Sequence, residues 1–214
     1  MWPPVRDNET RIAAYIAAHG QTALQQAITG GQCDRPDGLF YGGDKPAWSN
    51  RVFRDVLRRY ASSRRRFAWI DFHTGLGPYG HAEKILSGPD DAAMIARAKA
   101  WWGIDVTSFH DGSSTSAALT GVNYEAPIAE CRGAELTGIG LEYGTVPFAE
   151  ALQALRADQW LRNHPGANAT TRAAIKRQIR DAFYCDADDW KGMVYGQARA
   201  AVLQALQALH ATTS

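Results

Sequence analysis

The chain of 214 residues contains only three cysteines, and this scarcity excludes a scaffold held together by disulfides. Cys33, Cys131 and Cys185 are widely spaced and form no Cys-x-x-Cys pair, which is typical of a protein from a reducing compartment. No apolar run is long enough to span a membrane, and residues 1–4 lack the basic start and apolar stretch of a signal peptide. We therefore expect a cytoplasmic protein without a membrane partner.

The sequence also lacks an excess of charge of either sign, with a formal net charge of +1. General nucleic-acid-binding proteins normally carry a strong basic excess, so we expect no nucleic-acid partner. The single basic cluster at 64–66 lies between a predicted helix and a predicted strand and is interpreted as a solvated turn. Neither a glycine-rich phosphate loop nor a Gly-x-Ser-x-Gly nucleophile motif occurs, which argues against a nucleotide hydrolase and a serine hydrolase.

What is present is an ordinary globular composition, with 45% apolar and 21% charged residues. Two apolar runs, 67–72 and 136–143, predict buried strands. Residues 74–80 and 111–121 are expected to be loops. Helical spacing predicts helices over 9–19, 22–28, a segment capped by Ser49 or Asn50 that extends to Tyr60, 90–102, 146–161, 170–183 and 190–210. Strands that alternate with helices indicate an α/β fold, a mostly parallel or mixed sheet covered by helices, in one domain over residues 1–214.

The first strand ends in a group of residues suited to chemistry. Asp71 and His73 are two residues apart, so they share one face of a strand, and a carboxylate can orient a metal-binding imidazole. The carboxyl end of a strand is where α/β sheets place ligands. Tyr79 follows in the glycine-rich segment, either as a mobile phenol near a substrate or as a packing residue. Taken alone, His73 would be more simply explained as a hydrogen-bonded residue at a strand end.

Glu142 is the more unusual residue, because it lies inside the second apolar strand between two glycines, Gly140 and Gly144. A buried carboxylate is costly unless it is paired, binds a metal or serves as an acid/base group with a shifted pKa. The competing interpretation is an edge strand with Glu142 directed into water. We give that alternative somewhat less weight.

Five further segments carry a family resemblance: 36–43, 48–51, 73–80, 181–184 and 188–191. With His73 and Glu142, they resemble the zinc carboxypeptidase superfamily, in a bacterial branch long labelled as of unknown function, over nearly the whole chain. The resemblance implies that His73 supplies the third zinc ligand. It implies that Glu142 is the general base, and that the substrate is a peptide or an acylated amino acid.

The sequence departs from that family at one point. The family takes its first two zinc ligands from a His-x-x-Glu motif, and none of the six histidines here is followed three residues later by Glu. Asn50-Arg51 looks like the family's substrate-binding pair but lies in the wrong region of the pattern. Because a catalytic zinc needs three protein ligands, we expect zinc binding to be weak or absent. Rescue by His81, Glu83 or His110 is not expected, since they are interpreted as part of a loop with surface charges.

The resulting hypothesis is a zinc-dependent amide hydrolase that is inactive as this chain because it resembles only the C-terminal part of such an enzyme. Without neighbouring strands, apolar edges would be exposed. We therefore expect a missing N-terminal segment, a partner chain, a homo-oligomer or marginal stability. The alternative is a non-catalytic remnant or binding module that keeps the fold. A helical interaction protein is a third possibility, based only on the Ala/Leu-rich segment 190–210.

Overall fold

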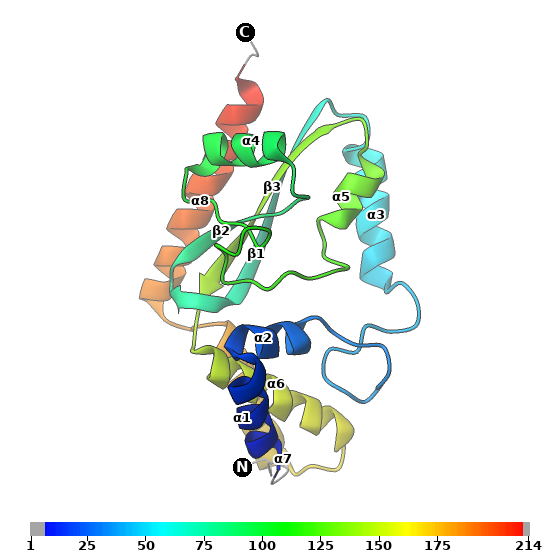
Figure 1. Ribbon diagram of the computed structural model, residues 1–214, viewed down its shortest axis with the longest axis vertical. Helices are drawn as coiled ribbons and strands as arrows, with labels where there is room; N and C mark the ends of the chain where they lie inside the picture. Colours follow the sequence, from blue (N-terminus) through cyan, green and yellow to red (C-terminus); the bar gives the residue numbers. More distant parts are fainter. Residues whose placement is uncertain (1–6, 212–214) are drawn as a thin grey trace. The chain divides into compact units, whose positions relative to one another are not determined.

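The structure is a computed structural model that describes residues 7–211 (Figure 1). These residues form two compact units. The first contains the chain up to Asp44, Ala117–Thr120 and Val146–Cys185, and the second contains Lys45–Ser116, Gly121–Thr145 and the chain from Asp186 onward. Each unit is described by itself. Within the described residues, no helix is both long and apolar enough to cross a membrane.

The first unit is helical. It contains α1 (Asn8–His19), α2 (Gln21–Thr29), α6 (Phe148–Asn163) and α7 (Ala169–Phe183). Helix α1 packs on α2, and α6 packs on α7 around the buried residues Ala157, Leu161 and Ile175. Asn168 caps α7 by accepting a hydrogen bond from the Thr171 amide at 2.8 Å. All four helices begin and end within two residues of the predicted bounds.

The second unit holds the sheet, formed by β1 (Arg66–Tyr79), β2 (Ala82–Leu86) and β3 (Glu135–Gly144). The strand order is β1-β3-β2, with β3 parallel to β1 and antiparallel to β2 (Figure 1). The helices of this unit are α3 (Trp48–Tyr60), α4 (Ala92–Trp102), α5 (Glu125–Glu130) and α8 (Asp188–His210). The prediction of an α/β fold with a mixed sheet and covering helices is confirmed.

The two faces of the central strand β3 differ in chemistry because its sequence alternates. Thr137, Ile139, Leu141 and Tyr143 are at most 1% exposed and form the buried face. Helices α4 and α8 cover that face: an arginine of α4 donates to Thr137, and the Tyr143 hydroxyl donates to a carbonyl of α8. The intervening positions carry glycine, glycine, glutamate and glycine. Beyond Leu136, the second face is therefore nearly free of β3 side chains, and Glu142 is the exception.

Three local predictions were wrong. Strand β1 continues to Tyr79, through the segment that was expected to be a loop, and the short strand β2 was not predicted at all. Helix α3 begins at Trp48 after Ala47, and no side chain caps it, so neither Ser49 nor Asn50 has the expected capping role. The Asn50 side chain instead accepts a hydrogen bond from Arg54 one turn later, at 3.2 Å.

The end of β3 is a close crossing of backbones at Gly144. The Gly144 carbonyl accepts from the Gly80 amide and from the Trp190 indole, both at 2.9 Å, and its amide donates to the His81 carbonyl at 3.1 Å. A methyl group on Gly144 would overlap the carbonyl group of Pro78. This crossing fixes the turn between β1 and β2 against the strand that carries Glu142.

Gly144→Ala is expected to lower the free energy of unfolding by about 1–2 kcal/mol, because the backbone of 78 or 144 must shift to admit the methyl group. Urea denaturation measures the change. Gly166→Ala is the matched control, since nothing lies within 4 Å of the added carbon there. Equal stability of the two variants would mean that the crossing is not tight.

Candidate functional site

The middle of β1, and not its carboxyl end as expected from the sequence, brings Asp71 and His73 together. His73 Nε2 lies 2.9 Å from Asp71 Oδ2, as expected for residues that share one face of a strand. Asp71 Oδ2 also accepts from Asn123 Nδ2 at 3.3 Å. The Asp71 hydrogen bond raises the pKa of His73, and this outweighs burial. Burial raises the pKa of Asp71, but the contacts with His73 and Asn123 outweigh it and leave that pKa below its usual value.

Glu142 lies beside this pair because of the strand register. In the parallel pairing of β1 with β3, His73 is directly opposite Glu142. Glu142 Oε1 accepts a hydrogen bond from the Leu76 amide at 3.1 Å. Burial raises the pKa of Glu142 to about 7, although the positive charge of His73 and the Leu76 amide lower it. The structure thus gives Glu142 a carboxyl group that ionises near neutral pH.

Glu83 is the residue that the sequence analysis misjudged. It was expected in a loop with surface charges, but it lies in β2 and is 8% exposed. It accepts from Thr107 Oγ1 at 2.6 Å, from the Thr115 amide at 3.1 Å and from Thr115 Oγ1. Burial raises its pKa, but these hydrogen bonds outweigh burial and hold the pKa below its usual value. A buried carboxylate so well supplied with donors stays ionised.

The register of β2 against β3 completes a row of three ionisable groups. Glu83 is directly opposite Glu142, which is directly opposite His73, so the three residues cross the sheet side by side. Directly opposed residues point to the same face of a sheet. The row therefore places one carboxyl group with a raised pKa between a cation-forming imidazole and a carboxylate that stays ionised. Environments that move the pKa values of neighbouring carboxyl groups apart are typical of acid/base sites.

The structure gives the other predicted residues different surroundings. The Tyr79 hydroxyl donates to Asp189 Oδ1 at 3.2 Å, so this phenol joins β1 to α8. His110 Nε2 lies 3.0 Å from the Gly88 carbonyl, and His81 is exposed. Neither histidine is directly opposite Glu142 in the sheet register, in contrast to His73.

The groups that could hold a metal ion are few. Across residues 7–211 no set of three or more His, Cys, Asp or Glu side chains is arranged to bind one. His73 Nε2 is engaged by Asp71, which leaves Nδ1 as the ring nitrogen that could face a ligand. A catalytic zinc requires three protein ligands, so the described residues do not by themselves fit a catalytic zinc site.

Asp71→Asn is expected to lower the pKa of His73, because the hydrogen bond and the charge of Asp71 raise that pKa in the wild-type protein. The pH titration of the His73 ring signals in an NMR spectrum measures the shift. Asp105→Asn is the control, since Asp105 pairs with Lys84 at 3.0 Å and does not contact His73. An unchanged His73 titration in Asp71→Asn would contradict the pairing.

The sequence profile of one family, described as protein of unknown function (DUF2817), matches residues 1–197. No curated protein and no solved structure matches the chain.

Proposed function

Because the chain belongs to the DUF2817 family, whose function is unknown, we propose a function from the residues themselves: the row of His73, Glu142 and Glu83 is the acid/base centre of an amide hydrolase. The proposed substrate is a peptide or an acylated amino acid. The resemblance of the strand-end motifs to zinc carboxypeptidases supports the reaction type. The observation that carries the proposal is Glu142, whose pKa of about 7 suits a group that must both accept and release a proton.

The reaction would use Glu142 twice. As a carboxylate, Glu142 accepts a proton from a water molecule while the water oxygen forms a bond to the amide carbon. The protonated Glu142 then donates that proton to the amide nitrogen as the carbon–nitrogen bond breaks. The products are a carboxylic acid, which loses its own proton to water at neutral pH, and an amine, and Glu142 is restored as the carboxylate.

His73 and Glu83 would have electrostatic roles in this proton transfer. The raised pKa of His73 favours its protonated form, which can stabilise the oxyanion that forms on the amide carbonyl. The negative charge of Glu83 raises the pKa of Glu142, so Glu83 is a positioning residue with an electrostatic role. Hydrolysis is therefore expected to increase as the pH rises through about 7 and Glu142 ionises.

Zinc is the cofactor that the family resemblance implies, and His73 is the ligand that it assigns. The described residues do not complete a zinc site, so each step above is assigned to the chain's own residues. Were zinc present, it would polarise the carbonyl group and the attacking water. Further ligands would then have to come from outside the row.

The test is hydrolysis of acetylated amino-acid amides by the purified chain, with and without a large excess of Zn²⁺. Excess metal fills even a weak site by mass action. The chain alone is expected to be inactive, because it lacks the His-x-x-Glu ligands. With excess Zn²⁺ we expect hydrolysis above the background of Zn²⁺ alone, and Glu142→Gln is expected to reduce it by roughly 100-fold or more, the range for loss of a general base. The matched control is Glu150→Gln, an exposed glutamate of α6.

Equal rates in the wild-type protein and in Glu142→Gln would contradict the proposal. A rate that never exceeds the Zn²⁺ background would favour a second function, a non-catalytic binding module that keeps the fold. That candidate is favoured by one observation: among the described residues no three-ligand metal group exists. Metal analysis of the purified chain provides an independent measurement, since near-stoichiometric zinc that is lost in His73→Ala would exclude the non-catalytic module.

A further inference from the structure

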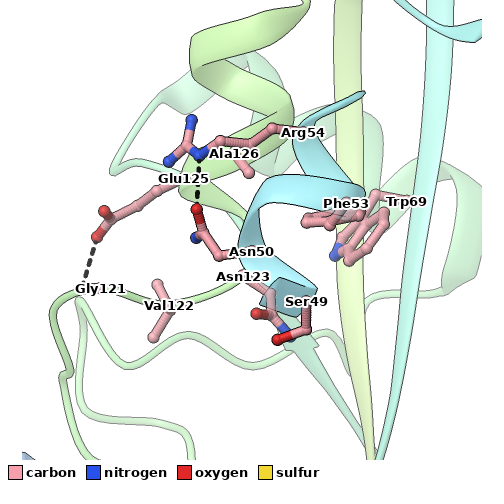
Figure 2. A pocket seen from close by; sticks show the side chains of 10 residues that line it. All are labelled: Ser49, Asn50, Phe53, Arg54, Trp69, Gly121, Val122, Asn123, Glu125 and Ala126. Carbon is pink, nitrogen blue, oxygen red and sulfur yellow. Dashed lines mark hydrogen bonds between the residues drawn. The ribbon is translucent and has the colours of Figure 1, made fainter. Parts of the chain in front are cut away.

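A cavity of about 400 Å³ opens on the face of β1 that carries Asp71 and His73. Trp69 lines it from β1, Asn50 and Phe53 line it from α3, and residues 121–126 close the opposite side (Figure 2). Trp69, Asp71 and His73 occupy alternate positions of the strand, so all three point to the same face. Its volume lies within the range of about 300–1,000 Å³ that is typical of small-molecule sites.

The Trp69 indole is the group in this cavity whose hydrogen bonding is incomplete. Its Nε1 is buried and has no hydrogen-bond partner among the described residues. A buried donor without an acceptor is unfavourable, which suggests that a ligand supplies the acceptor. Opposite Trp69 in the register is Gly138, where a side-chain carbon would lie 3.1 Å from the Trp69 side chain. The glycine therefore leaves room for the indole against β3.

Phe53 makes the cavity aromatic on one side. Its ring centroid lies 5.3 Å from that of Trp69, with the two planes tilted by 42°. Rings at this separation attract each other and offer a surface on which a third ring can pack. Figure 2 shows the two rings lying next to each other, apart from the polar side chains of Asn50 and Glu125.

The charged groups at the rim are already paired. Arg54 donates to Asn50 at 3.2 Å and to Glu130 at 2.9 Å, and Glu125 accepts from the Gly121 amide at 2.9 Å (Figure 2). A charged ligand would have to compete with these contacts. A neutral group meets no such competition.

Asn123 connects the cavity with the proposed reaction centre. It lines the cavity, and its Nδ2 donates to Asp71, which in turn contacts His73. A group held in the cavity is thus separated from the His73–Asp71 pair by one side chain.

We propose that this cavity binds a neutral aromatic group that carries a hydrogen-bond acceptor. The aromatic group packs against Phe53 and Trp69, and its acceptor receives the Trp69 Nε1–H. Identifying that group as the aromatic side chain of an amide substrate, such as a tyrosine side chain, rests on the proposed function. The binding site itself does not.

The experiment is an NMR titration of the indole N–H signals with three compounds: N-acetyl-tyrosine amide, N-acetyl-phenylalanine amide and N-acetyl-alanine amide. The signal that is missing in Trp69→Phe identifies Trp69. We expect the tyrosine compound to shift this signal and to bind about five-fold more tightly than the phenylalanine compound, the worth of one neutral hydrogen bond. The alanine compound should leave the signal in place.

Two variants separate the hydrogen bond from the aromatic surface. Because Trp69→Phe has no Trp69 signal, binding to the variants is measured by titration calorimetry. In Trp69→Phe, the tyrosine and phenylalanine compounds should bind equally, whereas Trp160→Phe in the first unit should keep the difference. Phe53→Leu should weaken both aromatic compounds, and it provides the test if Trp69→Phe does not fold. An unmoved Trp69 signal with all three compounds, or a tyrosine preference that survives Trp69→Phe, would overturn the inference.

Because the readout is binding, the outcome is independent of hydrolysis. If the chain binds the tyrosine compound at Trp69 but hydrolyses none of the amides, the binding site is supported and the proposed function is contradicted. If the chain hydrolyses the amides but the Trp69 indole N–H signal does not shift, the proposed function is supported and the binding site is contradicted.

Discussion

Glu142→Gln is expected to make the protein more stable at pH 8 while it removes hydrolysis. Burial raises the pKa of Glu142 from 4.5 to about 7, so at pH 8 the folded protein must hold an ionised carboxylate in an unfavourable place. Each pKa unit corresponds to about 1.4 kcal/mol, and the penalty is therefore about 3 kcal/mol before discounting for contact with water. Glutamine resembles the protonated acid and avoids that penalty.

The stability advantage of Glu142→Gln should shrink to zero as the pH falls. Between pH 4.5 and about 7 the folded state holds a proton on Glu142 that the unfolded state has lost, so wild-type stability decreases as the pH rises through this window. Below pH 4.5 both states are protonated, and the variant and the wild type should be equally stable. Urea denaturation at pH 4 and pH 8 measures the difference.

Glu150→Gln controls for the change of charge, since Glu150 is exposed. Its stability relative to the wild type should differ little between the two pH values. A Glu142→Gln variant that behaves like Glu150→Gln would show that Glu142 is well solvated, and the proposed base would lose its support.

Glu83→Gln is expected to have the opposite effect on stability, although Glu83 is directly opposite Glu142 in the sheet. Hydrogen bonds from Thr107 and Thr115 hold the pKa of Glu83 below its usual value, so the ionised form stabilises the folded state. This contribution is present above the unfolded pKa of 4.5 and is lost as the pH falls through the lower folded pKa. The variant should lose roughly 3 kcal/mol at pH 8, because hydrogen bonds to a buried charge are replaced by weaker neutral ones.

The pH dependence again identifies the cause. The loss in Glu83→Gln should be largest at pH 8 and should shrink at acidic pH, where the wild-type carboxylate is being protonated as well. Thr107→Val, which removes one of the hydroxyl donors, should show a smaller loss with the same dependence on pH. A loss in Glu83→Gln that is the same at every pH would indicate altered packing rather than a lost charge.

The sequence was sufficient for the fold class, the first and last strands and the proximity of Asp71 to His73. Strand periodicity decides that residues two apart share a face, so spacing alone places Asp71 and His73 on one side of the sheet, where the 2.9 Å contact forms. The length of the predicted apolar runs also located β1 and β3, because buried strands need such runs.

The remainder of the site depends on pairings between distant segments. Strand β2 has five residues and begins with Ala82-Glu83-Lys84, which resembles an exposed loop. Its register against β3 makes Glu83 a neighbour of Glu142, and no local pattern encodes that register. The sequence does not decide between a mobile phenol and a packing residue for Tyr79; what was wrong is the loop expected around it, because that segment is a strand whose end pairs with Gly144.

Strand order also determines when the sheet can form during synthesis. The strands β1 and β2 are close in sequence, yet each pairs with β3 and not with the other, so neither has its partner strand until residues 135–144 have been made. The β1–β3 pairing then closes a long loop, from Arg66 to Glu135, and pairings between such distant residues form slowly. A nascent chain that exposes the apolar strand β1 while it waits is prone to aggregate. The strand that carries Glu142, the proposed base, is thus also the one that completes the sheet.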